Sequence, residues 1–150
     1  MKFIVSMGIR KLPGGPQPMH EIYRDFLEEA VLAEELGFNA VWASEHHFSP
    51  DAWSPSPVPF LAAVAGSIGS GALERLPPVG EFRNLPGIGH GGAPFAVGTS
   101  ETVAEMLSAY RDKRLTHLVL TFHAPGMASE AVRRSMRAFA RDIMPAIGGW

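Results

Sequence analysis

The sequence contains no cysteine among its 150 residues. This absence excludes disulfide bonds, thiolate-bound metal sites and a cysteine nucleophile. A chain without cysteine is also compatible with a reducing compartment, and we interpret the protein as cytoplasmic.

The sequence also lacks a large excess of charge and a long hydrophobic run. Its 13 Lys and Arg residues and 15 Asp and Glu residues give a formal net charge of -2, which provides no electrostatic reason to expect binding to nucleic acid or to an anionic membrane. No stretch approaches the roughly 20 apolar residues of a transmembrane helix, and the N-terminus lacks the pattern of a signal peptide. The length and the hydrophobic content of 46% are typical of one globular domain.

The first third of the chain predicts a strand, a helix and a second strand. Residues 3–9 are a short apolar run that ends at a Pro-Gly-Gly-Pro cluster (13–16). A helix is expected from Pro18 to about Gly37, because apolar residues recur there at helical spacing and glycine favours a helix end. Residues 39–45 then form the second strand. Such a β-α-β unit predicts parallel strands with a right-handed connection.

The middle of the chain carries fewer periodic patterns. Residues 49–59 hold four prolines and three serines and predict a loop, which a short apolar helix over 60–68 follows. Residues 66–94 contain eight glycines and four prolines and are interpreted as a linker. The linker divides one domain into an N-terminal segment (1–65) and a C-terminal segment (95–150). Regular structure is not expected in residues 70–93.

The C-terminal segment predicts a helix, a strand and a second helix. The first helix begins at Thr99 or Ser100, the strand covers residues 115–122, and the last helix begins at Ser129 and ends at Pro145. The alternation of helices and strands along the chain indicates an α/β protein with a parallel sheet.

Candidate functional residues follow two of the predicted strands. Glu45, His46 and His47 end the second strand, and His123 ends the last one. The carboxyl ends of parallel strands meet at one edge of a sheet, where functional groups gather. His46 and His47 point to opposite sides of an extended backbone, so one of them can face this edge and transfer protons near neutral pH. The alternative is that both only form structural hydrogen bonds, and a structural role describes His123 better.

Other kinds of site have little support in the sequence. The histidines do not show H-E-x-x-H spacing, so no metal site is predicted, and no G-x-S-x-G motif accompanies the serines. Residues 87–92 match the dinucleotide pattern G-x-G-x-x-G, but they lie in the linker and are attributed to its glycine-rich composition. We interpret four arginines of the last helix as a solvated face and five methionines as core residues. These residues are Arg133, Arg134, Arg137 and Arg141, and Met7, Met106, Met127, Met136 and Met144.

Three segments resemble the luciferase-like, flavin-dependent monooxygenase family. AEELGFNAVWASEHHFSPDAWSPSP (33–57) is similar to the signature around that family's second strand, which ends in Glu-His-His-Phe. PFAVGTSETVAEMLSAYRDKRLTHLVLTFHAPGM (94–127) is similar to its closing helix and strand, and SMRAFARDIMPAI (135–147) is similar to its last helix, which contains a Met-Pro pair. The order of these elements makes the resemblance specific.

The resemblance implies a fold, a cofactor and a catalytic residue. The family folds as a (β/α)8 TIM barrel and uses reduced FMN, or in some branches a reduced deazaflavin, to oxidise a small organic substrate. The first histidine of the Glu-His-His-Phe element is the family's catalytic one, and it corresponds to His46. The flavin and the substrate are the implied partners. The residues that would bind the flavin are not assigned.

The chain is short for a complete barrel of this kind, which takes roughly 250 residues. The linker lies where the middle strands would be. Because the last strand of a closed barrel is next to the first, we expect an incomplete barrel of three parallel strands with residues 3–9 in the centre. Such a wedge has lost much of the wall around a flavin, so tight retention of FMN is not expected.

The wedge should expose apolar side chains on the surface that faces the interior of a complete barrel. We expect these to be Phe3, Val5, Val41, Leu118 and Leu120, or their strand neighbours. Covering them favours a homo-oligomer. The favoured function is a luciferase-like flavin-dependent oxidoreductase weakened by the loss of the barrel's middle. The alternative is a non-catalytic remnant or subunit that acts through its strand edges or by self-association.

Overall fold

The computed structural model describes residues 1–11, 14–45, 57–68, 96–123 and 126–150. The strands are β1 (Lys2–Met7), β2 (Ala40–Ala43) and β3 (His117–Leu120), and the helices are α1 (Met19–Glu35), α2 (Pro57–Ser67), α3 (Ser100–Ser108), α4 (Ser129–Ala138) and α5 (Met144–Ile147). A 3-10 turn, η2, covers Arg111–Lys113, and a π-helical turn, η3, covers Phe139–Ile143. Most of the expected linker, with the predictions made for residues 70–93 and 87–92, lies outside the described residues.

The three strands form one parallel sheet in the order β2-β1-β3. Ile4 pairs with Ala40 on one side of β1 and with Val119 on the other. The first strand of the chain therefore lies between a strand near it in sequence and one more than a hundred residues away. This order confirms the predicted wedge with residues 3–9 in its centre, while a closed barrel is not formed by the described residues.

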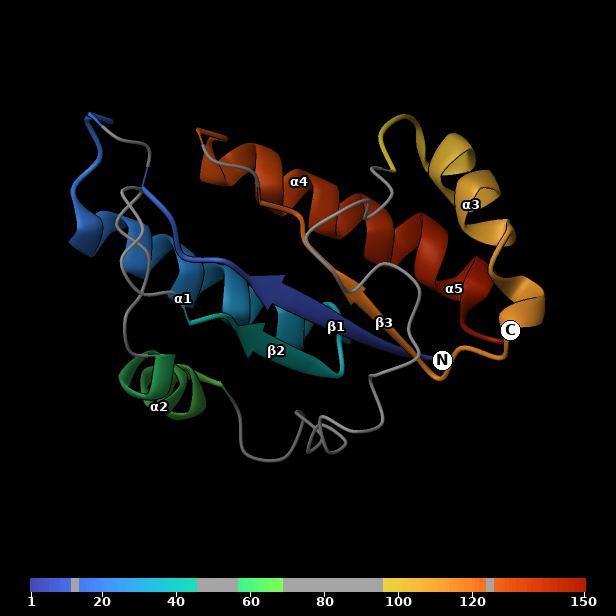
Figure 1. The fold of residues 1–150 in the computed structure, drawn as a ribbon, viewed down its shortest axis with the longest axis horizontal. Coiled ribbons are helices and arrows are strands. Elements are labelled where there is room, and N and C mark those ends of the chain that lie inside the picture. The colour runs from blue at the N-terminus through green and yellow to red at the C-terminus, as the bar shows by residue number, and fades with distance from the viewer. Residues whose placement is uncertain (12–13, 46–56, 69–95, 124–125) are drawn as a thin grey trace.

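Helices α1 and α4 pack against one face of the sheet and lie behind it in Figure 1. Phe139 lies at the centre of this packing. Its ring centroid is 6.1 Å from that of Phe3 on β1, 6.3 Å from that of Phe38 before β2 and 5.6 Å from that of Phe122 after β3. One aromatic side chain of the C-terminal segment thus contacts residues next to all three strands.

The faces of the sheet differ from the expected assignment. The residues expected on the open face were Phe3, Val5, Val41, Leu118 and Leu120. The first three are buried and the two leucines pack against the same core, so all five face the helices and the named set is wrong. The opposite face carries Ser6, Trp42 and Thr121 near the carboxyl ends of the strands, and Ile4 and Ala40, which are buried, further back. Alternation separates the faces, and the helices cover the face without Ser6 and Thr121, so the hydroxyl groups of these two residues are not buried beneath them.

Local signals determine two of the helix ends. Gly37 has φ +81° directly after α1, a left-handed conformation that suits glycine and ends the helix as predicted. At the start of α3, the Thr99 hydroxyl accepts a hydrogen bond from the backbone N–H of Thr102 at 3.3 Å. This bond satisfies one of the free donors of the first turn, as expected for an N-cap threonine.

Pro145 does not end the last helix, contrary to the prediction. The N–H of Met144 donates to the carbonyl of Phe139, five residues back, which closes the π-helical turn η3. Pro145 then falls in the first turn of α5, where the missing N–H of proline has little cost. The helix continues to Ile147, whose side chain is buried.

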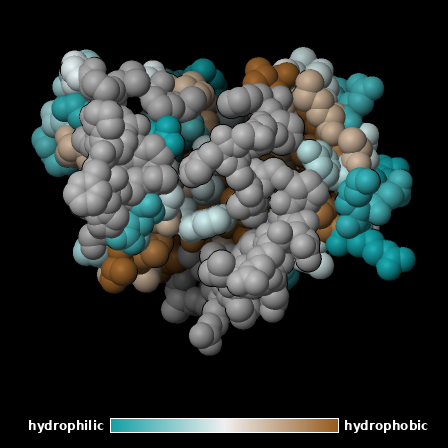
Figure 2. Space-filling model, viewed as in Figure 1, coloured by the Kyte–Doolittle hydropathy of each residue, from teal (hydrophilic) through white to brown (hydrophobic). Residues whose placement is uncertain are grey.

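Several apolar side chains are exposed to solvent in the described residues. Val58 and Leu61 on α2 are 71% and 36% exposed, and Figure 2 shows hydrophobic surface over this helix. Met106 and Met127 are also exposed, so the interpretation of these two as core methionines is wrong. Met7 and Met136 are buried as expected, and Met144 packs against the core.

Two glycines provide a matched test of the fold. Gly37→Ala is expected to lower the free energy of unfolding by about 1 kcal/mol, because alanine is strained at the positive φ that ends α1. Gly66→Ala within α2 should raise it by about 0.5–1 kcal/mol, because a Cβ there meets no atom within 4 Å and alanine favours a helix. Urea denaturation measures both changes. If both substitutions raised, or both lowered, the free energy of unfolding, the positive φ of Gly37 or the helical conformation of Gly66 would be contradicted.

Candidate functional site

The carboxyl ends of the three strands meet at one edge of the sheet. At β1 and β2 this edge is held by the pairing of Met7 with Ala43 and by the N–H of Ser44, which donates to the carbonyl of Met7 at 3.4 Å. The end of β3 is beside them, because Leu120 pairs with Val5 of β1. Parallel pairing therefore brings residues that follow β2 close to residues that follow β3, as the sequence predicts.

His46 and His47 lie outside the described residues. The last described residue before them is Glu45, which is exposed and follows Ser44 at the carboxyl end of β2. The structure therefore brings the chain to the predicted edge, and the role of His46 stays a prediction.

Polar and aromatic groups lie near this edge on the face of the sheet opposite α1 and α4. Ser6 of β1 is in register with Trp42 of β2, and the Trp42 side chain is 37% exposed. Thr121, directly after β3, is exposed as well. Hydroxyl groups and an indole can provide hydrogen bonds and a flat apolar surface for a ligand.

His123 does not join that group. Its ring packs on Phe26 of α1, with the ring centroids 4.9 Å apart. Burial lowers the pKa of His123 from its ordinary value of 6.5, and the nearby Asp25 carboxylate opposes this shift. The ring is therefore neutral at physiological pH and packs against a helix, which supports the structural role that the sequence favoured for it.

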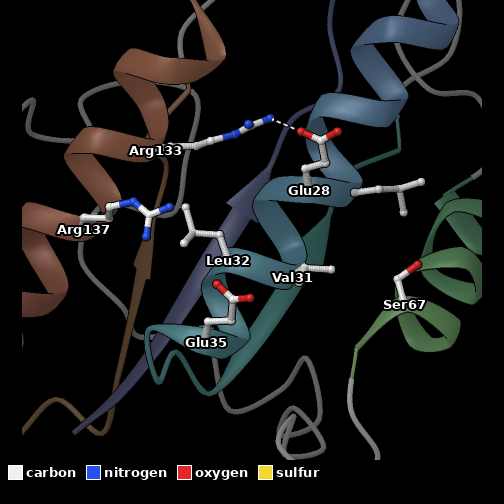
Figure 3. A pocket seen from close by; sticks show the side chains of 8 residues that line it. Glu28, Val31, Leu32, Glu35, Ser67, Arg133 and Arg137 are labelled. Carbon is white, nitrogen blue, oxygen red and sulfur yellow. Dashed lines mark hydrogen bonds and ion pairs between the residues drawn. The ribbon is translucent and has the colours of Figure 1, made fainter.

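A second polar group, between α1 and α4, was missed by the sequence reasoning. Glu29 is 2% exposed, and its Oε1 atom has no hydrogen-bond partner in the described part of the chain. Arg133 of α4 reaches α1 and donates from Nη2 to Glu28 Oε2 at 2.6 Å (Figure 3). One signal was available: Glu29 follows Ile22 by seven residues and Phe26 by three, which places it within the apolar stripe of the helix.

Arg133 also corrects the interpretation of the arginine stripe. Its side chain is 29% exposed, against 69% for Arg134 and 73% for Arg141. The stripe is therefore solvated at some positions, and at Arg133 it contacts the neighbouring helix. A groove of about 330 Å³ beside this contact is lined by α1, α2 and α4. Its charged residues are Glu28, Glu35, Arg133 and Arg137.

Residues 1–67, which include β1, α1, β2 and α2, match the sequence model of the luciferase-like monooxygenase family. This segment is therefore similar to the luciferase-like monooxygenase family. The match confirms the resemblance from which His46 was assigned. The match does not extend to the C-terminal segment.

Two curated relatives share part of the sequence of this chain. The uncharacterized protein y4vJ of Sinorhizobium fredii (strain NBRC 101917 / NGR234) is 38% identical over 53 residues, which are 35% of this chain and 15% of that protein. The uncharacterized protein y4wF of the same organism is 51% identical over 43 residues, 29% of this chain and 13% of that protein. The matches therefore span less than one sixth of either relative's length. No solved structure matches the chain.

The described residues at the carboxyl edge offer few groups that could hold a flavin. They are Ser6 and Trp42, which are in register on neighbouring strands, and Arg10, which follows β1 in the sequence. A bound cofactor of this size is normally enclosed by walls on several sides. Three strands provide one such wall, so the described residues do not form a complete flavin site.

Two further properties concern the described residues only. They include no group of three or more His, Asp or Glu side chains that could hold a metal ion. Within the same residues, no helix is long and apolar enough to cross a membrane.

Proposed function

We propose that this chain is a flavin-dependent oxidoreductase of the luciferase-like kind, which uses reduced flavin and dioxygen on a small organic substrate. The match of residues 1–67 carries the proposal, because it covers the strand-end element Glu45-His46-His47-Phe48. FMN is the proposed flavin, and a deazaflavin is the alternative. The order β2-β1-β3 supports the further proposal that both segments are neighbouring parts of one incomplete barrel.

His46 is the proposed catalytic residue. It follows Glu45 in the sequence, and Glu45 is exposed after the end of β2. An imidazole can hold or transfer a proton near neutral pH. Reduced flavin, when bound, supplies the electrons for the reaction with dioxygen. The exposed indole of Trp42 and the hydroxyl of Ser6 belong to the same face and would orient the ring system.

The second candidate function is a non-catalytic subunit that acts by self-association. In the described sheet, β2 and β3 each pair with β1 on one side only. An edge strand can pair with a strand of another chain, and the exposed apolar side chains of α2 add hydrophobic surface. A homo-oligomer is proposed under both functions, because in either case the unpaired edges of β2 and β3 in the described sheet and the exposed apolar side chains of α2 have to be covered.

One set of measurements tests the two functions together. Sedimentation at micromolar protein with added FMN, followed in the protein and flavin absorbance bands, is expected to show a dimer or larger species carrying a small, reversible fraction of flavin. In stopped-flow experiments the protein should change the rate at which dioxygen reoxidises reduced FMN. His46→Ala should lower the protein-dependent rate of reoxidation by about 10²–10⁴-fold, the usual contribution of a proton-transferring side chain.

His20→Ala is the matched control, because His20 is exposed on α1 and should leave the reoxidation rate unchanged. If an oligomer forms but the protein neither binds FMN nor changes reoxidation, the subunit function replaces the enzyme. A monomer without flavin would contradict both. Stoichiometric flavin in the purified protein would support the enzyme and show that the site is more complete than its described wall.

A further inference from the structure

The interface between α1 and α4 joins the N-terminal and C-terminal segments of the chain. Buried apolar residues of both helices belong to one core, including Phe26 and Ala30 of α1 and Val132 and Met136 of α4. Glu29 lies among the buried residues of α1. It is the single charged residue that is buried in the described part of the chain, with 2% of its surface exposed.

The charges around Glu29 are unevenly matched. Three carboxylates of α1, those of Asp25, Glu28 and Glu29, lie beside the guanidinium of Arg133 on α4. The exposed Arg24 of α1 also lies 4.0 Å from Asp25 Oδ1 and 4.0 Å from Glu28 Oε1. Arg133 Nη2 lies 2.6 Å from Glu28 Oε2 and 3.9 Å from Asp25 Oδ1. Three carboxylates therefore share two positive charges, and the shortest of these contacts is made by Arg133 with Glu28, not with Glu29.

Unpaired polar atoms remain on both sides of the interface. Glu29 Oε1 and Arg133 Nε are buried and have no hydrogen-bond partner among the described residues. A buried carboxylate without a direct partner is costly, whereas its protonated form carries no charge. The other nearby groups do not compensate, because Gln17 Nε2 donates to Asp25 Oδ2 at 2.8 Å and the ring of His123 lies against Phe26.

We propose that Glu29 is a proton-binding site between α1 and α4, which holds the two segments together when protonated and loosens them when it ionises. The uptake of one proton neutralises the buried carboxyl and leaves two carboxylates, Asp25 and Glu28, opposite the two guanidinium groups of Arg24 and Arg133. Loss of the proton leaves a charge that is best relieved by water, and water reaches Glu29 only if α4 separates from α1.

The direction of the pKa shift agrees with this geometry. Burial raises the pKa of Glu29 from 4.5 to about 7, against the opposing attraction of Arg133. A group with a raised pKa in the folded state binds its proton there between pH 4.5 and about 7, where the unfolded chain has released it. The stabilisation is therefore fully present below pH 4.5 and is lost as the pH rises to about 7.

Glu29→Gln tests the proposal, because glutamine keeps the shape of the protonated acid and cannot ionise. In urea denaturation from about pH 5 to about pH 8.5, wild-type stability should fall more steeply with pH than that of the variant. The pKa of Glu29 is 4.5 in the unfolded chain and about 7 in the folded one, so the unfolding equilibrium constant should rise by up to about 300-fold as the pH increases through this range. Glu29→Gln should abolish this rise. If the free energy of unfolding of Glu29→Gln differs from that of the wild type by the same amount at every pH, the proposal is wrong.

Glu28→Gln is the control for the surrounding charges. It removes the half-exposed partner of Arg133 and should keep most of the wild-type pH dependence. If Glu29→Gln does not fold, carboxyl NMR of the wild-type protein gives the answer directly. Titration of Glu29 near 7 supports the proposal, and titration near 4.5 overturns it. Arg133→Gln should move the Glu29 titration to higher pH, since the guanidinium favours the ionised form.

Discussion

Phe139→Ala is expected to lower the free energy of unfolding by about 3–5 kcal/mol, the usual cost of truncating a buried phenylalanine. Phe139 is 4% exposed, and its ring lies edge-on to Phe3 and Phe122 and stacks on Phe38. These partners belong to β1, to the turn before β2 and to the residues after β3. Truncation therefore leaves a cavity where both segments meet, in a domain whose total stability is ordinarily about 5–15 kcal/mol.

Chemical denaturation followed by circular dichroism measures this loss. Phe139→Leu should cost less, because leucine fills part of the cavity. Met106→Ala is the control, because Met106 is 46% exposed and its truncation should change the stability by at most about 0.5 kcal/mol. A similar small cost for Phe139→Ala would show that the aromatic cluster does not join the segments.

Phe26→Ala is expected to have a second large effect, again about 3–5 kcal/mol, with a titration signature of its own. Phe26 is 1% exposed, and one side of its ring packs on His123. Burial lowers the pKa of His123 from 6.5. Removal of the ring admits water to the imidazole, so the pKa of His123 should rise toward 6.5.

The pH dependence of this effect has a definite sign. In the wild type the folded state resists protonation of His123, so the contribution of this residue to stability is present above pH 6.5 and is lost as the pH falls below that value. In Phe26→Ala this dependence should shrink. The stability difference between wild type and variant should therefore narrow below pH 6.5.

NMR titration of the His123 ring protons measures the shift directly. Ile22→Ala is a matched control, because Ile22 is also buried on α1 and its truncation should cost about 2–5 kcal/mol without changing the His123 titration. An unchanged His123 pKa in Phe26→Ala would show that the aromatic contact does not cause the shift.

Much of the fold is readable from local patterns in the sequence. The apolar run over residues 3–9, the helical spacing before Gly37 and the Thr99 cap predict β1, α1 and the start of α3, because each depends on neighbouring residues only. The order of the strands came from the family resemblance, since no local pattern specifies which distant strands pair. For the candidate site, the sequence identifies Glu45, His46 and His47 as following a strand, and the sheet places Glu45 at its carboxyl edge.

By itself, then, the sequence determined the type and position of the main elements, because backbone geometry and hydrophobic period act over a few residues. Only the tertiary structure decided which face of the sheet the helices cover, since alternation defines two faces without choosing between them. It also decided the roles of Glu29 and Arg133. A glutamate in an apolar stripe becomes a buried proton site only where another helix covers it, and α4 is brought to α1 by pairing between β1 and β3.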